Sequence, residues 1–458
     1  MQEASLTEGN HPFYKQQIKG SNFLIMIRFL LLVCLMGAFG TVNAQNLTLD
    51  EAINIALKNS LNVEVAKNNF EADKLNNNLA IAGGIPTVSA TITDNQSLTN
   101  LNQRLSNGTN IKRNGNRNNA LNAGLDVDYL LFNGYRVRYT KSRLEATEKQ
   151  SEYGINLQMQ NLVASVMVRY YDIVRQDEYL KTLQQSINVT QQRLKLVDAR
   201  QSVGLANNAD TYQAQLDLNA SRQDLLSQQL ISEQAKADLL SLLTLKPDST
   251  VYIKDTIIVD KAINLEAVKS NLKISPAFLS ADQQAIINEL LVKEIGARRY
   301  PAVSINSGYN YVRSKNGAGF TLLNQNSGPF LGLGVQIPIF NGGIIKRQQN
   351  IARFDTKNAI NAREILLNDL ENFAVRAWLA YKNNLERLDT ERENNRVAAD
   401  LLSLVEQRFQ LGVGTIVDLR EAQRSFVDAG FRLTNLAYAA KVAEIELKRL
   451  ASMLAVGQ

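Results

Sequence analysis

Chemically reactive side chains are scarce in this sequence. Its 458 residues include one Cys, one His, one Trp and seven Pro. The single His is His11 and the single Cys is Cys34, and both precede the export-signal cleavage site predicted below. The mature chain would then lack both residue types, which excludes disulfides, His general bases, Cys nucleophiles and nearly all zinc, haem and iron–sulfur sites. We therefore expect no catalytic, cofactor or metal site, and no enzyme.

Long apolar runs are also missing, with one exception near the start. Residues 29–39 read FLLLVCLMGAF, and Arg28 precedes them. Val42-Asn43-Ala44 follows with small or apolar residues at the −3 and −1 positions, which predicts a secretory signal cut after Ala44. The run is too short for a membrane helix, which needs about 20 residues. Met26 is a conventional start, so residues 1–25 are either an upstream extension or a long n-region.

A strong excess of one charge is absent as well. Beyond residue 44 the chain has 47 Lys and Arg against 42 Asp and Glu, so we expect no nucleic-acid partner. The densest basic cluster is Lys112, Arg113 and Arg117, in an Asn- and Gly-rich stretch that reads as a solvated loop. Cys34 follows Val33, where a lipobox would have a small residue, so lipidation is disfavoured. Because no run of 18 apolar residues follows the signal, an exported chain could enter a membrane only as strands.

The chain repeats itself. Residues 131–134 (LFNG) match residues 339–342 (IFNG), and Val203-Gly204 matches Leu411-Gly412, all at an offset of 208. An offset held over more than 80 residues indicates helices that tolerate no insertion. We predict an upstream extension and signal peptide (1–44), a first repeat (45–256) and a second repeat (257–458).

Each repeat contains one predicted helical region before its strands and another after them. The first runs from about Thr48 to Ala82 in one copy and from about Asn264 to Arg299 in the other, where Pro276 should bend or interrupt it. The second has no Pro and allows one helix of 70 residues from Gly134 to Val203. Its apolar heptad row is Met159, Val166, Ile173, Leu180, Ile187 and Leu194, with Leu162, Leu183 and Val197 beside it; the second copy has Leu367, Ala374, Tyr381, Leu388, Asn395 and Leu402.

Four strands of roughly ten residues are predicted per chain from alternation of apolar and polar residues. A polar loop separates the two strands of each repeat. The apolar sets are Val88, Ala90 and Ile92; Leu121, Ala123, Leu125, Val127, Tyr129 and Leu131; Val303, Ile305, Ser307, Tyr309 and Tyr311; and Leu331, Leu333, Val335, Ile337 and Ile339.

These strands have the length and pattern of membrane-spanning β-strands, although a soluble sandwich shows the same alternation. In lipid an open sheet edge is forbidden, and about eight strands are the fewest that close. Several chains must therefore share one barrel. Aromatic residues that could form interfacial belts are Phe132, Phe340, Tyr129, Phe330, Tyr309 and Tyr311.

The strand-to-helix joints Phe132-Asn133-Gly134 and Phe340-Asn341-Gly342, with the duplicated element order, resemble TolC-type outer membrane efflux proteins. The resemblance covers most of residues 46–455. It implies a homotrimer with a 12-stranded barrel in outer membrane lipid and an α-helical tunnel in the periplasm. It also implies a passive duct that serves a resistance–nodulation–division (RND) or ABC pump of the inner membrane through a periplasmic adaptor (membrane fusion protein). The cargo is not readable from the sequence.

The turns between the long helices are the candidate sites. Gly204 and Gly412 suit left-handed positions after a helix, and Asp210 and Asp418 suit the third position of the next helix. By resemblance, adaptor-docking turns contain Gly204, Leu205, Gly412, Val413 and Gly414, and the periplasmic gate contains Asp418, Glu421, Asp210, Phe409 and Gln410. Gly414 stands where some family members have Arg, so we expect closure by packing and by Phe409, Gln410 and Asp210 contacts rather than by an ion pair.

A rival interpretation is a periplasmic coiled-coil adaptor or scaffold that never enters the membrane. Its long helices would show the same heptad pattern, because periodicity alone does not distinguish a tunnel wall from a soluble coiled coil. The two interpretations differ in extraction. The scaffold should come into solution without detergent, whereas the channel should fractionate with outer membranes.

Overall fold

The computed structural model describes residues 46–454, so the predicted signal sequence with His11, Met26 and Cys34 lies outside the described residues. Thr48–Ser249 and Ile253–Gln458 form one large compact unit, whereas Asn46, Leu47 and Thr250–Tyr252 belong to a second unit. In the second unit the Leu47 N–H donates to the Tyr252 carbonyl oxygen at 2.9 Å. The helices and strands within residues 46–454 all belong to the large unit.

The strands form one antiparallel sheet in the order β1-β2-β3-β4. Their bounds are Thr87–Arg104 (β1), Asn110–Phe132 (β2), Ala302–Asn316 (β3) and Leu323–Gln336 (β4). They contain between 14 and 23 residues, so the predicted length of about ten was wrong. The polar stretches continue the ladders instead of forming loops, because backbone N–H and C=O groups pair whatever the side chain. Lys112, Arg113 and Arg117 accordingly lie in β2.

The pairing register confirms that the predicted apolar sets share one face of the sheet, except at Leu131, where the register shifts and Phe132 instead lies opposite Val303. Val88 lies opposite Val127, Leu125 opposite Tyr309, and Ser307 opposite Leu331. This face is uncovered in the single chain: Ile92 and Leu331 are each 78% exposed. The opposite face carries mainly Ser, Thr, Asn, Asp and Gly.

Two details of β4 differ from the prediction. Phe330 lies opposite Gly308 and therefore on the polar face, so its assignment to an outer aromatic belt was wrong. A Cβ on Gly308 would come within 2.9 Å of the Phe330 ring, so the glycine makes room for it. The strand also ends at Gln336 rather than at Ile339, because Pro338 has no N–H for the ladder.

The first helical region is not one helix, as predicted, but two: α2 (Leu49–Asn59) and α3 (Leu61–Asn76). Ser60 separates them. Its N–H closes α2 on the Ala56 carbonyl oxygen, and its hydroxyl accepts the Val63 N–H that begins α3. The equivalent region of the second repeat is interrupted before Pro276, as predicted, into α6 (Leu265–Asn271), a short 3₁₀ turn η1 (Leu272–Ile274) and α7 (Pro276–Ala297).

The long helices confirm the predicted lengths. α4 (Arg136–Ser202) and α8 (Ile344–Gln410) each have 67 residues, whereas α5 (Asn208–Leu242) and α9 (Ile416–Leu450) each have 35, and both pairs are offset by 208. The heptad rows are largely buried: Ile173 and Ala374 are fully inaccessible. No helix within residues 46–454 is both long and apolar enough to cross a membrane.

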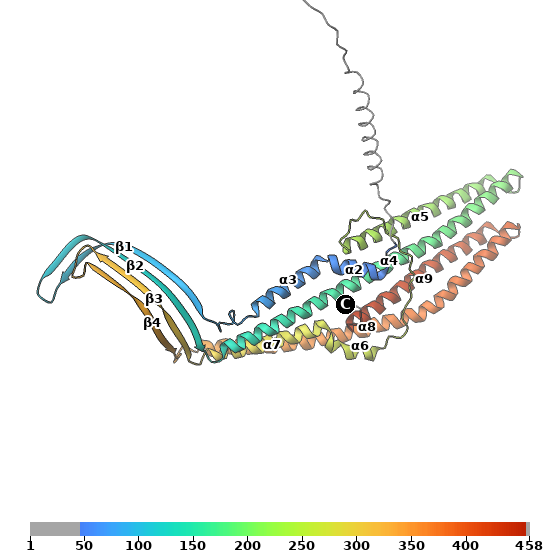
Figure 1. The fold of residues 1–458 in the computed structure, drawn as a ribbon. Helices are drawn as coiled ribbons and strands as arrows, with labels where there is room; N and C mark the ends of the chain where they lie inside the picture. The colour runs from blue at the N-terminus through green and yellow to red at the C-terminus, as the bar shows by residue number, and fades with distance from the viewer. Residues whose placement is uncertain (1–45, 455–458) are drawn as a thin grey trace, which may run out of the picture. The chain divides into compact units, whose positions relative to one another are not determined.

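α4 is the central helix of the bundle. It packs against α3, α5, α7 and α9, and α8 packs against α7 and α9. Figure 1 shows α4 and α8 leaving the same end of the sheet, with α5 and α9 returning beside them. This arrangement brings the α4–α5 and α8–α9 turns to the end of the helices that points away from the strands.

Candidate functional site: the turns of the long helices

Both turns begin with the same backbone motif. Gly204 and Gly412 adopt φ values of 76° and 82°, the left-handed conformation that favours glycine. After α4, the Leu205 N–H donates to the Arg200 carbonyl oxygen at 2.8 Å, and after α8 the Val413 N–H donates to the Arg408 carbonyl oxygen at 3.0 Å. These are Schellman motifs, which satisfy the last carbonyl groups of each helix.

Both turns end with a capping box, as the structural interpretation of the two aspartates predicts. The Asp210 N–H donates to Asn207 Oδ1 at 2.9 Å, and the Asn207 N–H donates back to Asp210 Oδ2 at 3.2 Å. Thr415 and Asp418 exchange the same pair of hydrogen bonds at 3.1 and 3.2 Å. The hydrogen bonds with the Thr415 hydroxyl and N–H lower the pKa of the exposed Asp418 carboxyl.

Phe409 is an anchor of the turn rather than an exposed gate residue within one chain. It is 4% exposed and packs in a cluster with Val197, Leu402 and Leu419. The Arg200 guanidinium lies 4.8 Å from its ring centroid and donates to its carbonyl oxygen at 2.6 Å. α4 is thereby joined to the end of α8. Gln410, the next residue, is exposed.

The other predicted gate residues lie at the start of α5 and α9, where Asp210 is half-buried and Asp418 and Glu421 are exposed. Asp418 and Glu421 stand one helical turn apart, and Glu421 lines a hollow between α4, α5 and α9. Within the described part of the chain, no hydrogen bond or ion pair joins Glu421 to another side chain. The same holds between Asp210 and either Phe409 or Gln410, so one chain does not bring the whole predicted gate together.

Gly414 holds its turn tightly against the end of α8. Its N–H donates to the Arg408 carbonyl oxygen at 3.1 Å, and a Cβ at this position would lie 3.0 Å from the Phe409 backbone nitrogen. A side chain here would require the backbone to shift by a few tenths of an ångström. The tight turn therefore favours glycine at position 414.

A buried polar cluster beside the turns was missed by the sequence reasoning. The Arg193 side chain is 1% exposed and donates to Asp217 at 2.6 Å, and Arg420 lies 3.7 Å from the same carboxylate. Gln423 of α9 donates to the hydroxyl groups of Ser186 and Thr190 on α4, each at 2.6 Å. Burial lowers the pKa of Arg193, although Asp217 opposes the shift. The heptad pattern had no signal for this cluster, since Arg193 stands next to, and not in, the apolar row.

The two strand-to-helix joints differ in packing. At the first, Gly134 has a φ of 69°, and a Cβ there would lie 2.6 Å from the Ala297 carbonyl oxygen, so glycine allows α7 to approach. Asn133 accepts the Val137 N–H at 3.3 Å, and the Phe132 and Tyr135 rings meet edge-on. At the second, no described residue beyond its chain neighbours would come within 4 Å of a Cβ at Gly342. Phe340 there is 88% exposed, and the Asn341 carbonyl oxygen accepts the Ile344 N–H at 3.2 Å.

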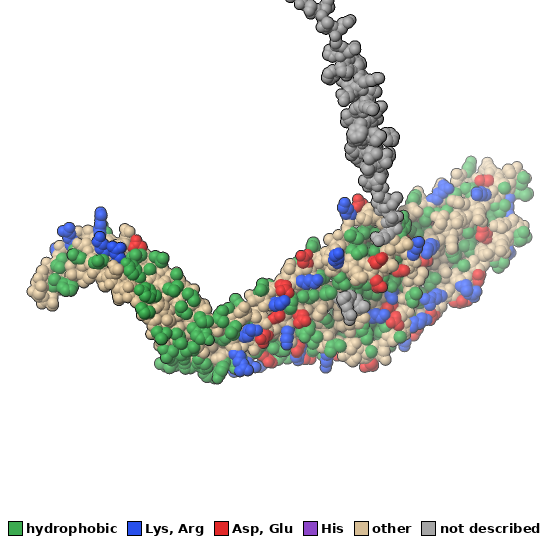
Figure 2. All heavy atoms as spheres, in the orientation of Figure 1, with side chains coloured by type: hydrophobic (Ala, Val, Ile, Leu, Met, Phe, Trp, Pro, Cys, Tyr) green, Lys and Arg blue, Asp and Glu red, His purple; other side chains and the backbone are tan. Residues whose placement is uncertain are grey.

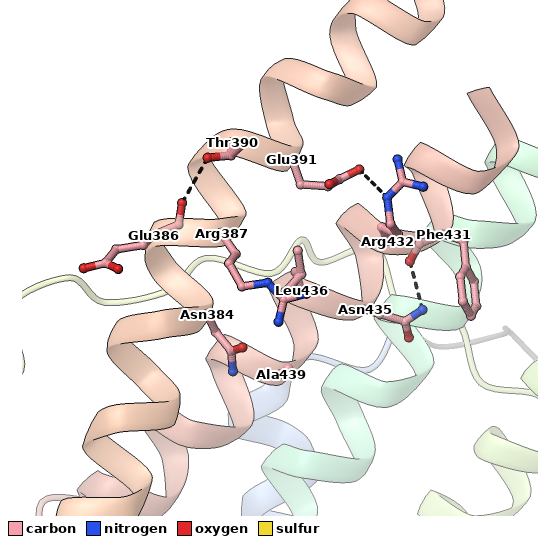
Figure 3. Close-up of a pocket in the computed structure, with 10 residues that line it drawn as sticks. All are labelled: Asn384, Glu386, Arg387, Thr390, Glu391, Phe431, Arg432, Asn435, Leu436 and Ala439. Atoms are coloured by element: carbon pink, nitrogen blue, oxygen red, sulfur yellow. Dashed lines mark hydrogen bonds and ion pairs between the residues drawn. The ribbon is translucent and has the colours of Figure 1, made fainter. Parts of the chain in front are cut away.

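A second hollow lies between α8 and α9, further from the turns (Figure 3). Glu391 of α8 accepts from Arg432 of α9 at 2.9 Å, and Asn435 donates to the Phe431 carbonyl oxygen at 2.9 Å. Asn435 also accepts from Arg175 of α4 at 2.8 Å. These bonds hold three helices together and therefore explain the polar lining without a ligand.

Known proteins share this architecture. The structure of the outer membrane protein VceC from Vibrio cholerae has a TM-score of 0.73 at 18% identity and covers 88% of this chain and 95% of its own. The structure of CusC has a TM-score of 0.73 at 17% identity, and the match covers 88% of this chain and 91% of the CusC chain. At these identities the likeness shows the fold alone, and it confirms the predicted fold class.

Sequence relatives agree. "Toxin and drug export protein A" of Aggregatibacter actinomycetemcomitans is 26% identical to this chain over 57% of the chain's length. The chain spans 58% of the length of that relative. "Outer membrane protein TolC" of Vibrio cholerae is 22% identical over 72% of this chain and 76% of its own. The family model described as "Outer membrane efflux protein" matches residues 52–244 and 270–452, which favours the channel over the scaffold interpretation. The chain therefore belongs to the outer membrane efflux protein family and resides in the outer membrane.

Proposed function

We propose that three copies of this chain form a passive exit duct through the outer membrane and the periplasm. The sheet supports this proposal: it has four strands, β1 and β4 are open edges within one chain, and its apolar face is uncovered. In a membrane every strand edge must pair, so the edge of one chain has to meet the edge of the next. Three chains would supply 12 strands, well above the smallest barrel.

The energy for export would come from partners. The chain itself is proposed to have no enzymatic activity, and an inner membrane pump of the RND or ABC type would drive transport. A periplasmic adaptor would dock at the turns containing Gly204, Leu205, Gly412, Val413 and Gly414. Exposed apolar side chains support that assignment, since Leu205 is 78% and Val413 67% exposed.

The gate is proposed to lie at the α8–α9 turn. Asp418 and Glu421 of three chains would place six carboxylates around a narrow bore, where they attract cations and repel anions. The exposure of both side chains and the lack of an ionic partner for Glu421 in the described residues support this role. Closure would depend on packing around Phe409 and on contacts of Gln410 and Asp210 between chains.

Single-channel recording in planar bilayers tests the proposal. Wild type should conduct and should be blocked by divalent cations from the side of the turns. Asp418→Ala with Glu421→Ala should change the conductance, lower the preference for cations over anions and weaken the block. Asp418→Asn with Glu421→Gln removes the charges but retains a side-chain acceptor for the Thr415 N–H, so it separates charge from capping. Glu64→Ala with Glu71→Ala, on α3, is the matched control and should behave as wild type.

The possible failures are distinct. If the purified chain forms no channel, the duct itself is wrong. If it conducts but both double variants at the turn leave conductance and divalent-cation block unchanged, the acidic ring is wrong while the duct stands.

A further inference from the structure

The end of the sheet farthest from the helices is strongly basic. Residues 95–120 and 310–328 contain six Lys and Arg and no Asp or Glu. These are Arg104, Lys112, Arg113 and Arg117 on β1 and β2, and Arg313 and Lys315 on β3. Figure 2 shows Lys and Arg side chains gathered over this part of the sheet.

These six cations have no acidic partners. All six side chains are exposed, and within residues 46–454 none of them takes part in an ion pair or a side-chain hydrogen bond. Cations on the helices commonly do, such as Arg396 with Glu393 at 2.6 Å. A set of unpaired like charges repels itself and attracts anions.

The register places five of the six cations on the apolar face. Arg117 lies opposite Leu98, and Arg313 opposite Leu121, on the same face as Val88 and Leu125. Lys315 follows Arg313 by two residues on β3. Arg104 continues the alternation of Leu98 along β1, and Lys112 of β2 lies opposite Asn102, which shares that face. Arg113 is the exception. The register shifts between Arg113 and Asn116, near Gly115, and Arg113 pairs with Leu101, which alternates onto the polar face.

Two of the cations border a hollow at this end of the sheet. Arg117 and Lys315 line it with Gln96, Leu98 and Asn119. The rest of the lining is Ser97, Asn118, Asn316 and Gly317, so the hollow combines two cations with four amide side chains and one apolar side chain. The nearest acid on this face, Asp94, already accepts hydrogen bonds from Gln96 and Asn119, so amides rather than cations satisfy it.

We propose that Arg104, Lys112, Arg117, Arg313 and Lys315, the basic band, bind the phosphate-bearing headgroups of the lipid leaflet around the distal end of the barrel. The proposal rests on the barrel proposed above. The apolar residues of the same face, such as Val88, Ile92 and Leu125, would contact the acyl chains. The band, further along the strands, would then lie at the level of the headgroups. Lys and Arg side chains reach from apolar surface to that level, and the guanidinium fork matches two phosphate oxygens. The surface suits a phosphorylated glycolipid, whose sugar hydroxyls would meet the amides of Gln96 and Asn119.

Titration with diphosphoryl lipid A tests the band. The full mature chain, purified in a neutral detergent, is the binding partner, and inorganic pyrophosphate is a parallel ligand. Arg117→Gln with Arg313→Gln and Lys315→Gln should weaken lipid A binding roughly a hundredfold, or about fivefold per cation. Arg117→Lys with Arg313→Lys retains the charge and should retain most of the affinity. Binding by wild type should weaken with salt.

Three exposed cations without ionic partners in the described residues form the matched control. Arg222→Gln with Lys246→Gln and Lys254→Gln removes the same charge from positions outside the sheet and should change lipid A affinity less than about twofold. Each variant is accepted only when its unfolding temperature equals that of wild type.

Other results overturn the proposal in identifiable ways. Unchanged lipid A affinity in the Gln variant would show that the band does not bind headgroups. Equal affinity for pyrophosphate would show a general anion site rather than a lipid site. If Arg113→Gln alone caused the loss, the anion would bind on the polar face inside the barrel. Conductance measured on the same preparations separates failure of the barrel from failure of the band.

Discussion

Thr415 decides where α9 begins. Its hydroxyl accepts the Asp418 N–H at 3.1 Å, and its own N–H donates to the Asp418 carboxylate at 3.2 Å. The four N–H groups that open a helix have no partner inside it, so this pair satisfies one of them and holds the turn in position. Asp418 thus serves its own helix even if it also faces a bore.

Replacing Thr415 with Ala should loosen the first turn of α9. Loss of the cap costs about 1 kcal/mol, which is roughly a fivefold rise in local opening. Hydrogen exchange of a peptide covering residues 413–421 measures this local opening, because opening exposes the backbone amides of these residues to solvent. Thr415→Ser retains the hydroxyl and should exchange like wild type. Equal exchange in the Ala variant would mean that neighbouring chains, rather than the cap, hold this turn.

Sequence reasoning at single residues worked where one chemical role was possible. Gly204 and Gly412 had to be left-handed turn residues, and both are. It failed at Ser60, because serine is acceptable inside a helix and its capping role depends on the chain around it. It also failed at Phe330. Phe330 and Leu331 are adjacent apolar residues, so alternation alone does not show which of them faces lipid, and the register with β3 decides.

At the scale of elements, a salt-bridge network holds the irregular segment that precedes α6. Glu444 on α9 is 1% exposed and accepts from Lys441 at 2.9 Å and from Lys448 at 2.9 Å. It also accepts the Asp260 N–H at 2.9 Å, and Lys448 reaches the Asp260 carboxylate at 3.1 Å. The Lys441 ammonium donates in addition to the Ile258 carbonyl oxygen at 2.9 Å. The segment is thereby joined to α9 by charge rather than by regular structure.

Asp260 should make stability depend on pH with a defined sign. The hydrogen bond from the Ala262 N–H and the ion pair with Lys448 lower its carboxyl pKa in the folded chain. Stabilisation is then present above the ordinary carboxyl pKa and is lost as pH falls through the lowered folded value. Asp260→Asn should lower the unfolding temperature at neutral pH, and the difference from wild type should shrink below about pH 4. A difference that persists in strong acid would mean that the variant acts through packing and not through charge.

Close packing of α4 against α9 depends on Gly430. A Cβ on Gly430 would lie 2.7 Å from Thr182 Cγ2, so Gly430→Ala must push the helices apart. Overpacking of this kind costs about 1–3 kcal/mol and outweighs the helix propensity gained, about 1 kcal/mol. Thermal unfolding should show a lower transition temperature for Gly430→Ala.

Thr182→Ala supplies the matched rescue for that variant, because it removes the two closest atoms of the clash. The double variant should unfold near or above the temperature of Thr182→Ala alone, since only the Cβ contact of 3.3 Å then opposes the propensity gain of alanine. If the double variant is as unstable as Gly430→Ala, the close contact with Thr182 is not the cause.

For the whole molecule, the long helices were predictable and the closure of the barrel was not. A heptad row without Pro and a repeat offset of 208 were enough to predict α4 and α8 within a few residues. The strands indicated only that several chains must combine. Two chains with four strands each would already reach the smallest barrel, and alternation contains no information about chain number. Buried charge such as Arg193 was equally unpredictable, because its partners come from other helices.

Disulfide trapping between the open edges should count the chains. β1 and β4 run antiparallel, so Ser89 near the start of β1 would approach Gly332, Gly334 or Gln336 near the end of β4 in the next chain, all on the polar face. We expect Ser89→Cys combined with cysteine at one of the three β4 positions to form a disulfide, because paired strands bring Cα atoms within bonding range of about 4.4–6.8 Å. The mature chain has no other Cys beyond residue 44, so products are unambiguous.

In a closed ring of three chains every introduced cysteine is paired with one of a neighbouring chain. Cross-linked bands on a non-reducing gel should therefore extend to three chains and no further, and Ser89→Cys alone should give no cross-linked bands. Bands that stop at two chains would replace the trimer with an eight-stranded dimer, and an unlinked monomer in all three pairs would remove the shared barrel.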